Sequence, residues 1–190
     1  GKDKVALILG DNFFYGQSLT KKLKDCIKLN SGCKILLHPV SKPELYGVAN
    51  INSKKKIVSI KEKPKKTNSN LAITGLYFFD NKVINYSKYL KPSKRNELEM
   101  IDLLNNYKRN NKLKAEFLGR GGAWLDTGSI NDFYNTSAFV SALENRQGFK
   151  IACLEEIAFK SKWINKKDIK KAISFYGNCI YSNYLKKIIQ

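Results

Sequence analysis

The stretch LILGDNFFYG, residues 7–16, decides the fold class of this chain. It joins an uninterrupted apolar run to the turn Gly10-Asp11-Asn12 and then to three aromatic residues. An uninterrupted apolar run indicates a strand that is buried on both faces, as in the parallel sheets of α/β proteins. Asp11 follows the carboxyl end of this strand, where ligands bind in open α/β sheets. The stretch therefore predicts an α/β fold with chemistry at the tip of its first strand.

The chain beyond this stretch alternates between strand-like and helix-like patterns. Strands are expected at residues 5–9, 34–38, 47–51, 57–62, 71–79 and 113–118. Helices are expected at residues 18–29, 82–90 and 99–110, and a loop at residues 119–128. We expect Thr74-Gly75 to break the strand at 71–79. Strands that alternate with helices predict an α/β fold, and a hairpin at residues 47–62 predicts a mixed rather than a purely parallel sheet.

The end of the chain is predicted to be mostly helical. Ser129-Ile130-Asn131-Asp132 has the form of a capping box and opens a helix to about residue 143. The apolar residues that this helix offers for burial are Ile130, Phe133, Tyr134, Phe139 and Val140. A second cap-like start lies at Asn165. A length of 190 residues fits one large domain with an appendage, which we place at residues 1–150 and 151–190.

The composition argues against a nucleic-acid partner, a membrane span and a zinc site. A net charge of +19 would suit a nucleic acid, but only four of the 35 basic residues are arginine, the better residue for bidentate recognition of phosphate and guanine. We therefore predict no specific nucleic-acid partner. No apolar run of about 18 residues occurs, so we expect no membrane span. The four cysteines form no CxxC pattern and predict neither a zinc site nor a redox pair, which fits a cytoplasmic, reducing location.

Two aspartates are candidate metal ligands. Asp11 closes the first strand, and Asp126 lies in the sequence WLDTG, residues 124–128, just before a helix. Magnesium generally takes one or two protein carboxylates together with substrate phosphates. Asp11 is explained equally well by an Asx turn, and Asp126 by a contribution to the helix cap. Although the two lie far apart in the sequence, they could converge on one metal.

Lys63 is a candidate phosphate ligand. It follows a strand in the sequence IKEKP, residues 60–64, and Pro64 keeps its backbone out of the right-handed helical region. A directed ammonium group is a good point charge for phosphate, and a solvated lysine is the plain alternative. Gly47 and Gly75 lie inside or beside strands, where a glycine marks either the close approach of a ligand or a bulge.

Taken together, these motifs resemble those of the glucose-1-phosphate thymidylyltransferases, which are sugar nucleotidyltransferases. The matching stretches are LGDNxFYG, PExYGV, EKP, AxTGLYFxD, LKPSxRxELE, GRGxAWLDTG and ENRQG. The resemblance runs through essentially the whole chain in the order and spacing of the family. It implies a three-layer, Rossmann-like mixed sheet of the nucleotidyltransferase type, with a helical C-terminal portion.

The resemblance also implies an activity. The family transfers a thymidylyl group from dTTP to glucose 1-phosphate, releases pyrophosphate and uses Mg²⁺, in the first step of dTDP-rhamnose and polysaccharide synthesis. By motif match, Asp11 and Asp126 would hold the metal, while Lys63 and Arg95 would hold the sugar phosphate and act in catalysis. The other residues implied to bind substrate are Tyr46, Gly47, Glu62, Thr74, Tyr77 and Trp124.

A second nucleotide site is implied as well. In the family this site lies near a subunit interface of a homotetramer and binds a dTDP-sugar as feedback regulator. The matching positions are Tyr15, Gly16, Arg120 and Arg146. The fork of an arginine suits this task because it pairs with diphosphate oxygens.

The glycine-rich phosphate loop of the family, GGxGTRLxPxT, has no match in this sequence. We therefore interpret the chain as the C-terminal two thirds of the enzyme, truncated at the N-terminus, with the sugar-phosphate half of the site. We expect these 190 residues to expose an open sheet edge and to be inactive alone. The alternatives are another sugar-1-phosphate nucleotidyltransferase that uses UTP, CTP or ATP, and a non-catalytic regulatory or basic binding module.

Overall fold

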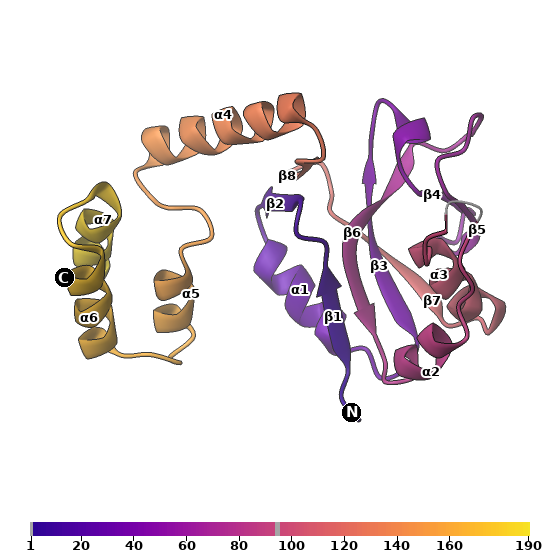
Figure 1. The fold of residues 1–190 in the computed structure, drawn as a ribbon, viewed down its shortest axis with the longest axis horizontal. Helices are drawn as coiled ribbons and strands as arrows, with labels where there is room; N and C mark the ends of the chain where they lie inside the picture. The colour runs from indigo at the N-terminus through magenta and orange to yellow at the C-terminus, as the bar shows by residue number, and fades with distance from the viewer. Residues whose placement is uncertain (1, 94–95) are drawn as a thin grey trace. The chain divides into compact units, whose positions relative to one another are not determined.

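The computed structural model describes residues 2–93 and 96–190 (Figure 1). They form two compact units that divide between Gly128 and Ser129. The boundary expected after residue 150 lies inside the second unit, and it stays a prediction because compactness alone does not define a domain.

The first unit contains both strands and helices. Its elements in chain order are β1 (Val5–Ile8), β2 (Asn12–Gly16), α1 (Leu19–Ile27), β3 (Cys33–Pro39), the 3-10 helix η1 (Pro43–Leu45), β4 (Val48–Ile51), β5 (Ile57–Lys61), β6 (Leu71–Phe79), α2 (Val83–Lys88), α3 (Met100–Arg109), β7 (Leu113–Phe117) and β8 (Gly122–Asp126).

The main sheet is mixed and is centred on β6. Its order is β5-β4-β6-β3-β7, and β1 pairs with the second half of β6. β3 and β7 run parallel, whereas β6 is antiparallel to β1, β3 and β4. β6 is a single strand through Thr74-Gly75, but its pairing with β3 is interrupted where the sequence led us to expect a break: between the pairs Leu37–Ile73 and Ile35–Tyr77, β6 has the residues 74–76 opposite Leu36 alone. The mixed α/β sheet is confirmed.

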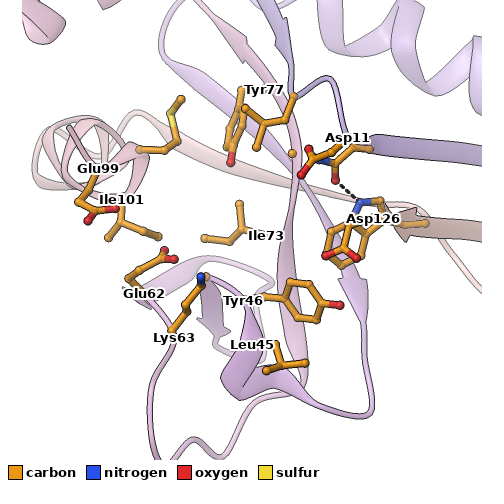
Figure 2. A pocket seen from close by; sticks show the side chains of 16 residues that line it. Asp11, Leu45, Tyr46, Glu62, Lys63, Ile73, Tyr77, Glu99, Ile101 and Asp126 are labelled. Atoms are coloured by element: carbon orange, nitrogen blue, oxygen red, sulfur yellow. Dashed lines mark hydrogen bonds between the residues drawn. The ribbon is translucent and has the colours of Figure 1, made fainter. Parts of the chain in front are cut away.

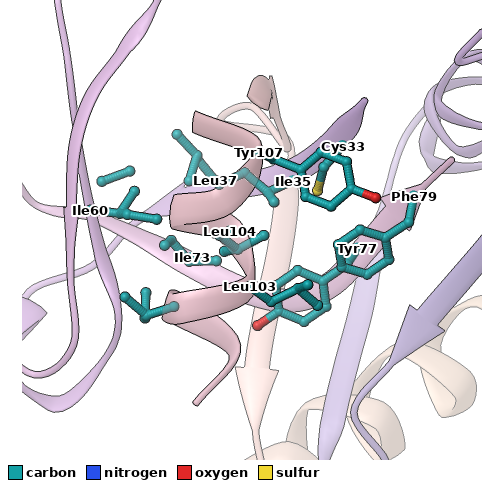
Figure 3. Packing of buried hydrophobic residues seen from close by; sticks show 12 residues of the cluster. Cys33, Ile35, Leu37, Ile60, Ile73, Tyr77, Phe79, Leu103, Leu104 and Tyr107 are labelled. Carbon is teal, nitrogen blue, oxygen red and sulfur yellow. The ribbon is translucent and has the colours of Figure 1, made fainter. Parts of the chain in front are cut away.

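Helices cover both faces of this sheet and complete three layers. On one face, α3 packs Leu103, Leu104 and Tyr107 against side chains of β3 and β6 (Figure 3). On the other face, Cys26 of α1 packs against Leu36 of β3 and its neighbours. The three-layer fold is thereby confirmed.

A buried carboxylate ties α3 to the sheet. Asp80, directly after β6, accepts hydrogen bonds from the Gly32 backbone N–H at 2.6 Å and from the Tyr107 hydroxyl at 2.8 Å. Burial, and next the bond to Asp80, raise the pKa of Tyr107 well above its usual range. The phenol therefore remains a neutral donor, and the α3 layer is held in a defined position on the sheet.

β1 forms as expected but is not buried. Val5, Ile8 and Leu9 expose 38%, 56% and 42% of their surfaces, and Leu7 is the residue of the strand that packs against the core. In the part of the chain that the structure describes, β1 pairs on one side only, with β6. The prediction of a buried strand is wrong because burial needs neighbours on both sides. The open sheet edge is the one that the sequence led us to expect.

The loop expected at residues 119–128 contains a strand, β8, so that prediction is wrong. β8 pairs antiparallel with β2 in a separate two-stranded ribbon, with Asn12 opposite Asp126 and Gly16 opposite Gly122. The approach is close at Gly16, where an added Cβ would lie 2.7 Å from the Gly122 Cα atom. The aromatic residues after Asp11 are therefore strand residues, and the ribbon brings two distant motifs side by side.

The second unit is helical. Its elements are α4 (Ile130–Gln147), α5 (Leu154–Lys160), α6 (Lys166–Tyr176) and α7 (Ile180–Ile188). Both predicted caps are confirmed: the Ser129 side chain accepts from the Asp132 N–H, and Asn165 forms a capping box with Asp168. None of the helices described combines the length and the apolar character that crossing a membrane requires.

The apolar residues at the start of α4 take no part in the core of their own unit. Ile130, Phe133 and Tyr134 expose 91%, 63% and 71% of their surfaces, although apolar periodicity favours a buried face. The core of this unit instead comes from Cys153, Ile169 and Leu185. Periodicity identifies the helix, but it cannot supply the surface on which the helix packs.

Candidate functional site

A pocket of about 270 Å³ lies in the first unit, beside the β2–β8 ribbon (Figure 2). Its polar lining comes from six separate regions of the chain: Asp11 and Asn12, Tyr46, Glu62 and Lys63, Tyr77, Glu99, and Trp124 and Asp126. Figure 2 shows Asp11 and Asp126 on one side of the pocket and Glu62 and Lys63 on the other. The fold therefore brings together most of the residues that the motifs singled out.

The two aspartates meet because β2 and β8 pair. Asn12 is opposite Asp126 in the ladder, and the Thr127 backbone N–H donates to the Asp11 carbonyl at 2.7 Å. The Thr127 hydroxyl donates to the same carbonyl at 3.0 Å. These bonds fix the backbone next to each carboxylate, so the two acids share one wall of the pocket.

This pair of carboxylates fits a divalent cation that a substrate completes. Among the residues that the structure describes, no three His, Cys, Asp or Glu side chains converge to hold a metal. Two carboxylates are nevertheless sufficient where phosphate oxygens supply further ligands. Asp11 and Asp126 provide oxygen donors only, which suits a hard cation rather than a soft one.

The opposite wall is built on the chain that follows β5. The Lys63 backbone N–H donates to the Tyr46 carbonyl at 3.0 Å, which holds residues 62–64 against η1. Lys63 has φ of 37°, in the left-handed region that favours glycine. The side chain is exposed and lines the pocket. Strained backbone of this kind persists only where the surrounding structure enforces it, and it concentrates at ligand sites.

Replacing Lys63 with glycine is expected to raise the free energy of unfolding by about 0.5–1 kcal/mol, because relief of the left-handed conformation exceeds the entropic cost of glycine. Chemical denaturation measures the change. The matched control is Lys162→Gly, at an exposed lysine with φ of 61° just after α5, which we expect to give a similar gain. A Lys63→Gly variant less stable than the parent, with Lys162→Gly more stable, would contradict a strained Lys63.

Two glycines leave room in the pocket. At Gly47 an added Cβ would lie 3.2 Å from both Glu62 Oε2 and Ile101 Cδ1. At Gly75 it would lie 2.6 Å from Asn12 Nδ2. Both glycines therefore mark close approach, and Gly75 also lies in the part of β6 where the register with β3 shifts.

Tyr77 contributes a neutral hydroxyl to the pocket. Burial raises its pKa well above its usual range, and the negative charge of Glu62 raises it further. A phenol that stays protonated at neutral pH both donates and accepts hydrogen bonds. Together with the Glu62 carboxylate, it makes this part of the pocket suitable for ligand hydroxyl groups.

Several predicted site residues lie elsewhere. Thr74 does not line the pocket: strand alternation turns it to the other face of β6, where its hydroxyl donates to the Leu36 carbonyl at 3.1 Å. Arg95 lies outside the described residues.

The four positions assigned to a second site belong to both units of the chain. Tyr15, Gly16 and Arg120 lie toward the end of the β2–β8 ribbon that is away from Asp126, whereas Arg146 is on α4 in the second unit. The structure therefore groups three of the four.

Sequence reasoning did not single out several residues of the pocket wall. They are Leu9, Asn12, Leu45, Ile73, Glu99, Met100 and Ile101. A weak signal exists for Ile73, because it shares a strand face with Gly75 and Tyr77 at a spacing of two. Nothing in the local sequence indicates that the start of α3 faces this pocket.

Known proteins resemble this chain closely. Residues 1–142 match the model of the nucleotidyl transferase family. Curated glucose-1-phosphate thymidylyltransferases from Neisseria meningitidis and Mycobacterium tuberculosis are 40% and 38% identical to it over 190 residues. Those matches cover 100% of this chain and 66% of each relative, so the chain spans about two thirds of their length.

Solved structures agree in fold. A Bacillus anthracis protein described as a glucose-1-phosphate thymidylyltransferase, solved with sucrose, is 39% identical with a TM-score of 0.65, over 73% of this chain and 55% of its own. A UDP-glucose pyrophosphorylase solved with UDP-glucose has the same TM-score at 22% identity, over 77% of this chain and 58% of its own. The second likeness concerns the fold alone.

Proposed function

This chain belongs to the nucleotidyl transferase family, and from that premise we propose that it forms the sugar-phosphate part of a glucose-1-phosphate thymidylyltransferase. The observation that carries the proposal is the pocket in which Asp11 and Asp126 lie across from Glu62 and Lys63. Carboxylates on one wall suit a cation, and a carboxylate with an ammonium on the other suits a sugar phosphate. The names of the relatives at 38–42% identity favour dTTP over other nucleotides.

In the proposed reaction, an oxygen of the glucose 1-phosphate attacks the α-phosphorus of dTTP. The bond from that phosphorus to the bridging oxygen breaks in line, and pyrophosphate leaves with the electron pair. Such transfers depend mainly on positioning and on charge stabilisation. The chain would position the sugar phosphate and stabilise its negative charge.

Each pocket residue then has a role. Lys63 would neutralise the phosphate of the sugar, together with Arg95, and these two would be the catalytic residues. Glu62 and Tyr77 would bind hexose hydroxyls above the space that Gly47 leaves, with Tyr46 and Trp124 shaping the wall.

Asp11 and Asp126 would hold the divalent cation, which we propose to be Mg²⁺ because both ligands are carboxylates and substrate phosphates supply the rest. When bound, the cation would offset negative charge on the phosphates. The pairing of Asn12 with Asp126 in the β2–β8 ladder supports this proposal, because it holds the two aspartates on the same wall of the pocket.

We also propose the second site and the assembly that the family resemblance implies. Tyr15, Gly16 and Arg120, at one end of the ribbon, would contact a dTDP-sugar regulator with Arg146, and the protein would form a homotetramer. The free thiols of Cys26, Cys33, Cys153 and Cys179 suit a reducing cytoplasm.

The test uses the purified 190-residue chain. Calorimetry is expected to show binding of glucose 1-phosphate that strengthens with Mg²⁺, whereas the chain alone forms no dTDP-glucose from dTTP and glucose 1-phosphate. The rest of the domain, supplied as a separate polypeptide from the Neisseria meningitidis relative, is expected to restore product. Product formed by the chain alone would contradict the half-site, and failure to bind glucose 1-phosphate would contradict the proposal itself.

The same mixture separates the alternatives. Product from UTP, CTP or ATP in preference to dTTP would identify another sugar nucleotidyltransferase. A basic nucleic-acid module would instead bind DNA or RNA with a steep dependence on salt. A regulatory module would bind a dTDP-sugar and never restore turnover.

A further inference from the structure

Asn12 occupies a position in the pocket that no motif role explains. Its Nδ2 donates to Asp11 Oδ1 at 2.6 Å, and its Oδ1 accepts from the Trp124 indole Nε1–H at 2.6 Å. One carboxamide thus connects a proposed metal ligand on one side to the pocket aromatic on the other. Both bonds are short, and the bond from Trp124 links two strands that are far apart in sequence.

Trp124 determines which way this amide points. An indole N–H is a donor only, so it pairs with the oxygen of the amide and never with its nitrogen. The Asn12 nitrogen must then face Asp11, where it donates to the carboxylate. Trp124 therefore fixes the orientation of the amide, and through the amide the orientation of the Asp11 carboxylate.

The sheet is shaped to receive this amide. A Cβ at Gly75 of β6 would lie 2.6 Å from Asn12 Nδ2 and 2.8 Å from Cγ. Gly75 is buried in the middle of β6, where a glycine lowers strand stability. The missing side chain is what lets Asn12 lie against the strand, and the strand limits the movement of the amide on that side.

The connection continues to the opposite wall. The Trp124 ring meets the Tyr46 ring edge-on, with centroids 5.0 Å apart and planes at 62°. The Tyr46 carbonyl in turn accepts from the Lys63 backbone N–H. A continuous set of contacts therefore runs from Asp11 through Asn12, Trp124 and Tyr46 to Lys63.

We propose that Asn12 is a positioning residue, which presents the Asp11 carboxylate for cation binding and couples that binding to the Trp124 indole. The inference rests on the proposed function, because it takes Asp11 and Asp126 as the cation ligands. Partners that orient a metal ligand typically change metal affinity by about 10- to 100-fold when they are removed. The same range is expected for Asn12.

Tryptophan fluorescence tests the coupling. The chain has two tryptophans, and Trp163→Phe leaves Trp124 as the single reporter. Titration of this variant with MgCl₂, with glucose 1-phosphate present, is expected to change the Trp124 emission. Adding Asn12→Ala is expected to weaken the apparent Mg²⁺ affinity about 10- to 100-fold and to abolish the change in emission at saturation.

Matched variants separate positioning from general damage. Asn50→Ala removes another strand amide, which donates to Ser59 Oγ at 3.0 Å away from the pocket lining, and is expected to leave Mg²⁺ binding unchanged. Trp124→Phe keeps both aspartates but releases the amide, and calorimetry is expected to show weaker Mg²⁺ binding here too. If Asn12→Ala does not fold, the Mg²⁺ affinity of Trp124→Phe tests whether the amide positions Asp11.

The outcomes are distinct. Unchanged Mg²⁺ affinity in Asn12→Ala and Trp124→Phe, while Asp11→Asn abolishes binding, would overturn the positioning role and leave the proposed function intact. Unchanged affinity in Asp11→Asn would overturn the cation site on which the inference rests. Equal losses in Asn12→Ala and Asn50→Ala would reduce the effect to lost strand stability and overturn the inference.

Discussion

Replacing Asp126 with asparagine is expected to weaken Mg²⁺ binding to this chain roughly 100-fold when glucose 1-phosphate is present. The substitution keeps the shape of the side chain and removes one of the two negative charges that the β2–β8 ribbon sets together. The attraction of a carboxylate for a cation near a protein surface is about 4 kcal/mol per unit charge at 4 Å, the loss of repulsion between the two aspartates offsets part of it, and each 1.4 kcal/mol that remains is tenfold in affinity. Isothermal titration calorimetry with MgCl₂ measures the change directly.

A matched carboxylate provides the control. Asp25 lies exposed on α1, pairs with Lys28 at 2.8 Å and does not line the pocket. Asp25→Asn changes the net charge by the same amount as Asp126→Asn and is expected to leave Mg²⁺ binding unchanged. If Asp126→Asn bound Mg²⁺ as the parent does, the ribbon aspartates would not be the cation ligands.

Replacing Lys63 with alanine is expected to weaken binding of glucose 1-phosphate about 10- to 100-fold. A hydrogen bond to a charged group contributes about 1.5–3 kcal/mol, which at 1.4 kcal/mol per tenfold corresponds to the expected range for Lys63. Calorimetry with glucose 1-phosphate, at fixed Mg²⁺ and low ionic strength, measures the loss.

Lys61→Ala separates a directed ammonium from the general positive charge of the molecule. Lys61 ends β5 two residues earlier, is exposed and does not line the pocket. We expect its removal to change the affinity for glucose 1-phosphate by less than twofold, because screening weakens a distant charge. Equal losses in the two variants would show that phosphate responds to the net charge of +19 rather than to the pocket.

Local sequence identified the aspartates, but only the fold could bring them together. Asp11 was predictable because a buried-type apolar run ends just before it. Asp126 lies on a strand that is hard to predict from the sequence, because β8 is five residues long and begins at Gly122, the end of the glycine-rich stretch Gly119-Arg120-Gly121-Gly122. Glycine is depleted in strands, so the pattern favoured a loop. The pairing of Asn12 with Asp126 is a long-range contact between two strands, and neither stretch of sequence predicts it alone.

The error in burial at β1 has a physical cause. The apolar run was assigned correctly as a strand, yet Ile8 is exposed. Periodicity reports which side chains are suited to a core, and the neighbouring elements decide whether a core exists there. The same limit applies to Asn12, whose role depends on a glycine and a tryptophan on other strands.

The open edge of β1 also bears on how the molecule behaves at high concentration. In the described part of the chain β1 pairs on one side only, and the backbone groups on its other side, next to the exposed Val5 and Ile8, can pair with a strand of another molecule. Lys2 and Lys4 flank this edge, and mutual repulsion between molecules of net charge +19 opposes such contact. Salt screens that repulsion within about 10 Å at 0.1 M, but it leaves the apolar edge unchanged. The positive charge of the abundant lysines therefore opposes strand-to-strand aggregation of this chain, and this repulsion weakens as ionic strength rises.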